Sequence, residues 1–129
     1  MADRRLLDYH ISRLISKSVD VRLKSIAELR LLDDADGWTA IAEAYATETD
    51  PAVRLAEQSA LADYVIIQLQ VSHSASARLA LIAQLQSLGA PQALPVLEQI
   101  YRADADPGVR QAARDAGYAI FARQKSSSS

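Results

Sequence analysis

DPGVR, at Asp106 to Arg110, repeats with one change a string found earlier in the chain, DPAVR at Asp50 to Arg54. Two weaker copies read SVDVR at Ser18 to Arg22 and SASAR at Ser74 to Arg78. The four arginines that end the strings are 32, 24 and 32 residues apart. Self-similarity at spacings of this size is typical of repeat architectures.

Each string has the composition of a helix start. Asp or Ser at the first position is a preferred N-cap, because its side-chain oxygen accepts a hydrogen bond from an unpaired backbone N–H. Proline suits the next position, where its missing N–H removes no hydrogen bond. The strings therefore predict helices that begin directly after Ser18, Asp50, Ser74 and Asp106.

The two 32-residue units align without a gap at an offset of 56 residues, up to and including the DPxVR strings. The matched residues are Leu23 and Leu79, Ile26 and Ile82, Ala27 and Ala83, Leu29 and Leu85, Leu32 and Leu88, Ile41 and Leu97, and Tyr45 and Tyr101. So many matches in one register indicate a tandem duplication. Gly37 and Gly89 are expected in equivalent loops between helices.

Apolar periodicity and the capping signals predict an all-α fold with about seven helices. The expected spans are 3–16, 19–32, 37–48, 51–71, 75–88, 91–103 and 107–124. In the first span, Leu7, Ile11, Leu14 and Ile15 share one face, which predicts an amphipathic helix. The expected domain covers residues 1–124, and residues 125–129 are expected to be a disordered Ser-rich tail.

The span 51–71 has two possible interpretations, because the 24-residue spacing is too short for a complete helix pair. It forms either one long helix or a short pair broken near Asp63. We favour the long helix, since neither Gly nor Pro occurs between Ala52 and Ser74.

Composition limits the classes of function. The 129 residues carry a formal net charge of −2, so no basic field is available for a nucleic-acid backbone. The chain has no cysteine, which excludes disulfides and thiolate chemistry. No apolar run approaches the roughly 20 residues that span a bilayer. We therefore expect a cytoplasmic protein that does not bind nucleic acid and is not inserted into a membrane.

The stretch GAPQALPVLEQIYRADADPGVRQAARDAGYAI, Gly89 to Ile120, resembles the HEAT-like repeat of phycobiliprotein lyases and their relatives. The residues that carry the resemblance are Ala93, Leu94, Pro95 and Leu97 in a first block, and Asp106, Pro107, Val109, Arg110 and Ala113 in a second. With weaker copies included, it covers nearly all of residues 18–124. The resemblance implies a right-handed α-solenoid of antiparallel helix pairs, whose second helices line a concave face where partners bind.

The resemblance also implies a ladder of Asp and Arg side chains between neighbouring repeats. Its expected members are Asp50, Arg54, Asp106 and Arg110, with Arg22 and Arg78 as further candidates. Serine replaces the family's acid at residues 18 and 74. The bilin-lyase members imply attachment or removal of a bilin, and we find no residue motif that carries this chemistry.

No group of polar residues forms a catalytic, cofactor-binding or metal-binding motif. His10 and His73 are far apart in sequence and lack the Cys or paired carboxylate ligands of a metal site. Asp33, Asp34 and Asp36 precede Trp38 and either bind a cation or basic peptide or act as acids at a helix N-terminus. We favour the structural interpretation, because the helix dipole stabilises acids there.

Two surfaces are candidates for contact with a partner. Asp20, Lys24, Glu28 and Leu31 follow one stripe of the helix expected over 19–32, and Gln84 and Ser87 lie on the equivalent stripe over 75–88. In a HEAT-like fold these stripes face the concave groove. The second candidate is the segment from Tyr64 to Leu97, in which Arg78 is the only charged residue. It is either buried between repeats or an uncharged contact surface.

The leading hypothesis is a non-catalytic adaptor, scaffold or assembly factor that presents a concave helical surface to a partner protein. One alternative is a bilin lyase subunit or chaperone-like factor that acts on phycobiliproteins and is related to the phycobilisome. Another is a structural module that homodimerises through the uncharged segment. No cofactor and no catalytic residue are expected.

Overall fold

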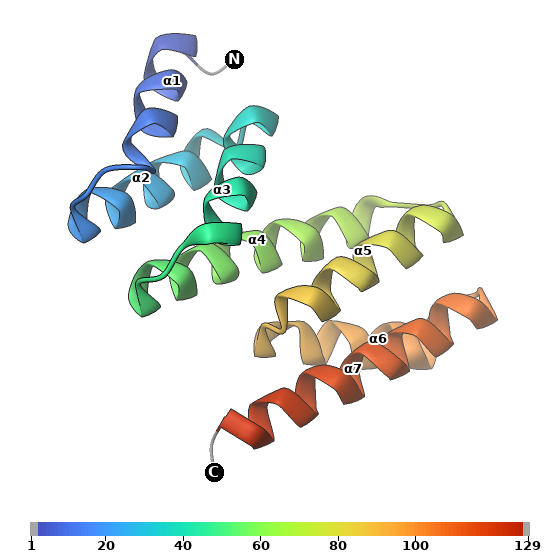
Figure 1. The fold of residues 1–129 in the computed structure, drawn as a ribbon. Helices are drawn as coiled ribbons and strands as arrows, with labels where there is room; N and C mark the ends of the chain where they lie inside the picture. The colour runs from blue at the N-terminus through green and yellow to red at the C-terminus, as the bar shows by residue number, and fades with distance from the viewer. Residues whose placement is uncertain (1–2, 128–129) are drawn as a thin grey trace. The chain divides into compact units, whose positions relative to one another are not determined.

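The structure, a computed structural model, describes residues 3–127. In this range the chain is all-helical and has no strand (Figure 1). Its elements are α1 (Arg4–Arg13), α2 (Val19–Leu32), α3 (Ala35–Thr47), α4 (Pro51–Val71), α5 (Ala75–Leu88), the short 3-10 helix η1 (Pro91–Ala93), α6 (Leu94–Ala103) and α7 (Pro107–Ser127). The prediction of an all-α fold with seven α-helices is confirmed for these residues.

Side-chain caps start the helices where the repeated strings predict. In each string the first residue accepts a hydrogen bond from the backbone N–H three residues later. The distances are 3.3 Å for Ser18 with Val21, 3.0 Å for Asp50 with Val53, 3.3 Å for Ser74 with Ala77, and 3.0 Å for Asp106 with Val109. The interpretation of residues 51–71 as one helix is also confirmed, since α4 is continuous.

The first helix is shorter than predicted, because α1 ends at Arg13 and not at residue 16. The backbone N–H of Ser16 donates to the carbonyl of Arg13 at 3.1 Å, which closes a turn and stops the helix. Leu7 and Leu14 are buried as expected, but Ile15 has left the helical register and is 85% exposed. The prediction that Ile15 shares their buried face is wrong.

The prediction that Gly37 lies in a loop is also wrong. Gly37 belongs to the first turn of α3 and is buried, and a Cβ there would lie 3.3 Å from Cδ2 of Leu29. The residue that corresponds to Gly89 at the 56-residue offset is Asp33. Both adopt the left-handed conformation, with φ of 49° at Asp33 and 69° at Gly89, and each ends its helix.

The chain divides into two compact units, Met1–Leu61 and Ala62–Ser129, with the boundary inside α4. In the first unit α1 packs on α2 and α3, and α2 packs on α3. In the second, α7 packs on both α5 and α6. Fully buried side chains include Leu7, Ile26, Leu29, Ile41 and Val53 in the first unit, and Leu69, Ile82, Leu85, Leu97, Val109 and Ile120 in the second.

The C-terminal helix α7 extends to Ser127, beyond the predicted end at residue 124. Near its end, Arg123 donates to the carbonyl of Gln86 at 3.1 Å, and Gln124 donates to the carbonyl of Gly89 at 3.0 Å. These bonds connect the end of α7 to the end of α5. Of the predicted tail over residues 125–129, Ser128 and Ser129 lie outside the described residues.

Replacing Asp106 by Ala should lower the free energy of unfolding by about 1 kcal/mol, because the N–H of Val109 then loses its acceptor at the start of α7. Urea denaturation followed by circular dichroism measures the change. The control is Asp115→Ala, which removes an exposed carboxylate within α7 and should change stability by less than about 0.5 kcal/mol. Equal effects of the two substitutions would contradict the capping role.

Candidate protein-binding site

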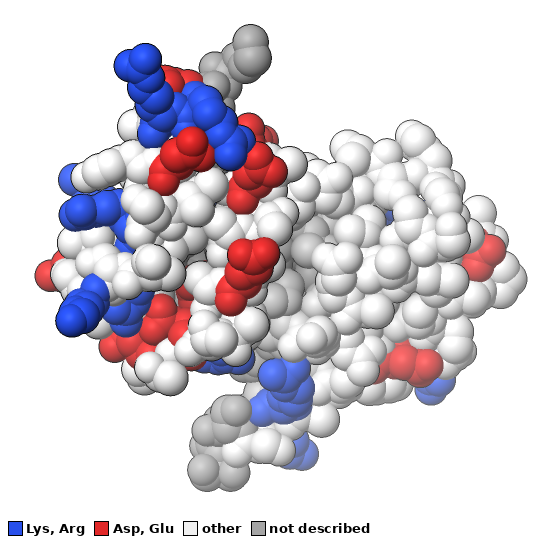
Figure 2. Space-filling model, turned by 45° about the horizontal axis from the view of Figure 1, so that its top comes forward, with Lys and Arg blue, Asp and Glu red and all other residues white. Residues whose placement is uncertain are grey.

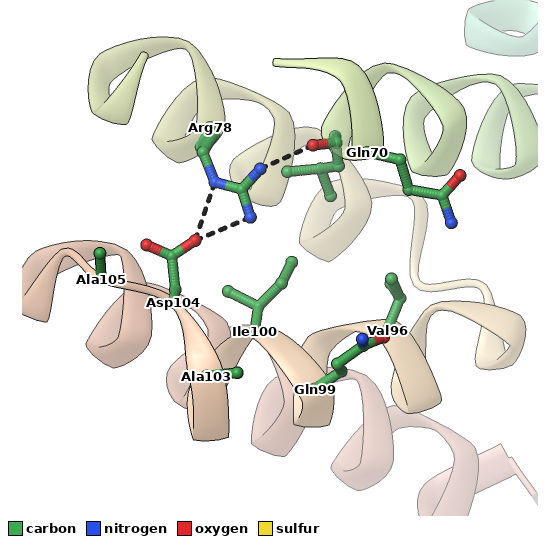
Figure 3. A pocket seen from close by; sticks show the side chains of 9 residues that line it. Gln70, Arg78, Val96, Gln99, Ile100, Ala103, Asp104 and Ala105 are labelled. Atoms are coloured by element: carbon green, nitrogen blue, oxygen red, sulfur yellow. Dashed lines mark hydrogen bonds and ion pairs between the residues drawn. The ribbon is translucent and has the colours of Figure 1, made fainter. Parts of the chain in front are cut away.

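Arg78 near the start of α5 holds together the ends of two other helices (Figure 3). Its Nε and Nη2 contact the Oδ2 atom of Asp104, the C-cap of α6, at 2.9 Å and 2.7 Å. Its Nη1 donates to the carbonyls of Leu69 at 2.6 Å and Ser72 at 3.1 Å, at the end of α4. The pair is largely buried, so water screens it weakly.

Arg22 makes the same connections 56 residues earlier. Its Nε and Nη2 donate to the two carboxylate oxygens of Glu48 at 3.0 Å and 3.2 Å, and its Nη1 donates to the carbonyl of Ser16 at 2.7 Å. Glu48 also accepts from the backbone N–H of Asp50 at 3.0 Å, just as Asp104 accepts from that of Asp106. We call Arg22 with Glu48, and Arg78 with Asp104, the two braces.

The residues expected to form the Asp–Arg ladder have other contacts. The carboxylates of Asp50 and Asp106 cap α4 and α7, and the acids of the braces lie two residues before them. Arg54 donates to the carbonyl of Tyr45 at 2.8 Å and stacks on its ring, 4.1 Å from the centroid. Arg110 donates to the carbonyl of Asp104 at 2.6 Å. The sequence did not lead us to predict Glu48 and Asp104 as the acids of the braces, although the two acids occupy the same place in the duplication.

Glu57 of α4 is a buried acid beside the first brace. It is fully buried, and neither of its carboxylate oxygens has a hydrogen-bond partner among the described residues. Burial raises the pKa of this carboxyl to about 7, the negative charge of Glu48 also raises it, and Arg22 and Arg54 lower it. The residue at the 56-residue offset is Ala113, which is buried without a polar group.

The stripe predicted on α2 lies at the surface. Asp20 and Lys24 are exposed, Glu28 is half-buried, and Leu31 is 80% exposed. We call these four residues the α2 stripe. On α5, Gln84 and Ser87 are exposed as well. The two stripes belong to different units.

A pocket of about 260 Å³ lies between α1 and α2 and borders the α2 stripe. Its lining consists of Tyr9, His10, Arg13, Val21, Lys24 and Ser25. The Arg13 guanidinium lies over the Tyr9 ring, 5.3 Å from its centroid, and the Tyr9 and His10 rings meet edge to face at 5.1 Å. The lining includes two cations and no acid, and we call it the basic pocket.

The acids before Trp38 have structural roles, whereas His10 lines the basic pocket. His10 is buried, and its place on the apolar side of α1 is the one sequence feature that could have indicated the pocket. Asp34 caps α3 by accepting from the N–H of Asp36 at 2.9 Å, and Asp33 accepts from the Trp38 indole at 2.7 Å. The prediction that these acids lie at a helix N-terminus is confirmed for Asp34 and Asp36, whereas Asp33 ends α2. In residues 3–127, no three His, Cys, Asp or Glu side chains are grouped so that they could hold a metal ion.

The uncharged segment from Tyr64 to Leu97 is buried at some residues and exposed at others. It therefore has features of both interpretations, a buried segment and an uncharged surface. Val65, Leu69, Ile82 and Leu85 are buried, whereas its glutamines at residues 70, 84 and 86 are exposed. On the face seen in Figure 2, one broad area has no charged side chain.

None of the helices in residues 3–127 combines the length and the hydropathy of a membrane span.

Comparison with known proteins gives no family assignment. No family model matches the chain, and neither a curated protein nor a solved structure matches it.

Replacing Arg78 by Lys should lower the free energy of unfolding by about 1–2 kcal/mol, because an ammonium cannot reach the Asp104 carboxylate and both carbonyls in the geometry of the guanidinium. The matched control is Arg102→Lys, which changes an exposed i,i+4 pair with Glu98 and should have almost no effect. If chemical denaturation shows that both variants lose the same free energy of unfolding, the brace does not stabilise the fold.

Glu57 should make the chain less stable as the pH rises. Its pKa in the folded state lies above the value of 4.5 in the unfolded chain, so the folded protein binds a proton that the unfolded chain has released. The stabilisation of the folded state by this proton is complete below about pH 4.5 and is lost as the pH rises through about 7.

Glu57→Gln keeps the shape of the side chain and cannot ionise. The free energy of unfolding of the variant, relative to that of the natural chain, should therefore increase between pH 4 and pH 8 by about 1–3 kcal/mol. Chemical denaturation at several pH values measures this difference. Glu43→Gln, an exposed glutamate of α3, is the control for loss of one acid. A difference that does not change with pH for Glu57→Gln would contradict the role of the buried acid.

Proposed function

We propose that the chain is a non-catalytic protein-binding module, an adaptor or assembly factor built from HEAT-like repeats, which presents the basic pocket beside the α2 stripe to an acidic side chain of a partner protein. The observation that carries the proposal is the position of Lys24. This residue belongs to the exposed α2 stripe and also lines the basic pocket. In this proposal the helices form a right-handed α-solenoid, and the α2 stripe lies on its concave face.

The size of the basic pocket favours a side chain over a whole cofactor. Pockets for drug-sized molecules have volumes of about 300 Å³ or more, and this pocket has about 260 Å³. Leu31, two turns further along α2 than Lys24, offers apolar contact outside the pocket. A small charged pocket beside an exposed leucine suits an extended protein partner that makes one polar and one apolar contact.

The charge of the basic pocket favours a carboxylate. Arg13 and Lys24 approach it from different helices, and Tyr9 and His10 provide its aromatic walls. A guanidinium that stacks on an aromatic ring still directs its N–H groups outward in its own plane, where a carboxylate accepts them. Hydrogen bonds between charged groups are stronger than neutral ones, so an Asp or Glu side chain would be held firmly.

The net charge of −2 gives no support to a nucleic-acid partner. A role as bilin lyase subunit or chaperone-like factor for phycobiliproteins stays a prediction from the repeat resemblance. A homodimer through the uncharged segment likewise stays a prediction.

Lys24→Glu should weaken partner binding by about tenfold or more, because it places a negative charge where the partner's acid would bind. A partner first has to be captured from a lysate of the source cells with the natural chain, identified by mass spectrometry and purified. Titration calorimetry then compares its affinity for the natural chain and the variant. Lys24 is exposed and lies one turn from Asp20 and from Glu28, so the loss of these two i,i+4 pairs should lower the free energy of unfolding by about 1 kcal/mol, which leaves the chain folded.

The control is Arg5→Glu, an equal reversal of charge at an exposed residue of α1 outside the basic pocket. It should change the affinity by less than about threefold, through long-range electrostatics alone. Leu31→Ser should weaken binding without changing its dependence on salt. A partner that binds Lys24→Glu as tightly as the natural chain would contradict the proposal.

A further inference from the structure

A second surface, between α6 and α7, is more apolar than the α2 stripe. It is a groove of about 460 Å³ whose lining includes Tyr101, Gly117, Tyr118 and Phe121. Tyr118 is 62% exposed and Phe121 is 57% exposed, and Tyr101 is also exposed. Aromatic side chains grouped around an apolar groove are typical of an interface, where they contribute most of the binding energy. We call this surface the aromatic groove.

The internal duplication places a corresponding face elsewhere in the chain, where it is buried. Helices α4 and α7 are each 21 residues long, and each begins directly after an Asp cap. Counted from the cap, Tyr118 therefore corresponds to Ala62, and Phe121 corresponds to Val65. Ala62 and Val65 are buried, whereas their counterparts on α7 are exposed.

The elements that follow α4 lie against it in the second unit. Arg78 of α5 donates to the carbonyl of Leu69, and Gln92 of η1 donates to the side chain of Asp63 at 3.5 Å. Two elements thus bond to this part of α4. The corresponding face of α7 carries larger side chains at Tyr118 and Phe121 and is open, so it can accept a second surface.

Gly117 is a second, independent sign of close helix contact. It lies inside α7 and has no positive φ, and a Cβ placed on it would have no heavy atom within 4 Å. Glycine inside a helix is less stable than alanine, and here neither a turn nor tight packing requires it. A glycine that faces an open groove allows the backbone of another helix to come close.

We propose that the aromatic groove is a homodimer interface, in which the α7 helices of two copies cross near Gly117 and Tyr118 and Phe121 of each copy fill the groove of the other. A second copy fits because the rim carries both signs of charge. Glu98 lies on α6 and Arg114 on α7, and a two-fold axis can bring the acid of one copy to the base of the other.

The area of the aromatic groove predicts a weak dimer. The exposed parts of three aromatic side chains amount to roughly 300 Å² per copy. Both copies together would then bury about half of the 1,200 Å² that marks the lower limit of stable interfaces, before the rest of the groove is counted. We therefore expect a dissociation constant in the micromolar range.

Sedimentation equilibrium of the natural chain over a concentration range of about 1 to 500 µM should show the mass rising from monomer to dimer. Phe121→Asp should raise the dissociation constant by about tenfold or more, because a charge would be buried in the interface. Leu55→Asp, a charge of the same kind at an exposed leucine of α4 outside both proposed surfaces, is the control and should leave the dissociation constant unchanged.

Gly117→Gln separates the interface from fold stability. The side chain enters open space and replaces a poor helix former, so the melting temperature should rise while the dimer weakens. A natural chain that stays monomeric at the highest concentration would overturn the proposal. A dimer unaffected by Phe121→Asp and Gly117→Gln but weakened by Gln84→Lys would place the interface on the uncharged segment and also overturn it. A monomer whose Phe121→Asp variant no longer binds a partner protein would assign the groove to that partner instead.

Discussion

The two braces are the interaction on which the rest of the structure depends. In each, an arginine near the start of a helix binds an acid that ends the next helix and a carbonyl at or just beyond the end of the previous one. Three chain segments are thereby fixed by one side chain. The acid also accepts the backbone N–H of the following Asp cap, so the next helix starts in a fixed position. A planar guanidinium with five donors can make all these bonds at once.

The duplicated positions show how the same framework supports different chemistry. Glu57 and Ala113 occupy equivalent places, yet one adds a buried ionisable group beside a brace and the other adds only a methyl group. Asp33 and Gly89 end equivalent helices in the left-handed conformation, which a non-glycine residue adopts at a cost. Asp33 accepts a hydrogen bond from the Trp38 indole, which offsets part of that cost. Backbone geometry is thus more alike between the copies than side-chain chemistry.

Much of the helical pattern could be predicted, because its signals are local. The caps at Ser18, Asp50, Ser74 and Asp106 depend on residues within one turn, so the sequence locates them directly. The end of α1 could not be located, since Ile15 continues the apolar pattern and only the turn closed by Ser16 stops the helix. Gly37 was predicted in a loop because glycine is common both in loops and where helices pack closely. Only its closeness to the Leu29 side chain distinguishes the two cases.

The candidate site was harder to predict, since its residues meet through tertiary structure. Lys24 could be assigned to an exposed stripe from helical periodicity alone. Its neighbours in the basic pocket, Tyr9, His10 and Arg13, come from another helix, and no spacing in the sequence brings them together. The acids of the braces were missed for the same reason, because each lies 26 residues from its arginine.

Each brace is complete within a short stretch of chain. All the bonds described for Arg22 fall between Ser16 and Glu48, and those for Arg78 between Leu69 and Asp104. A copied gene segment of that length therefore carries both the donor and its acceptors and leaves no buried charge without its counterpart. Such a segment can be duplicated or lost as a unit. The number of copies in a gene can therefore change during evolution without the need for new contacts.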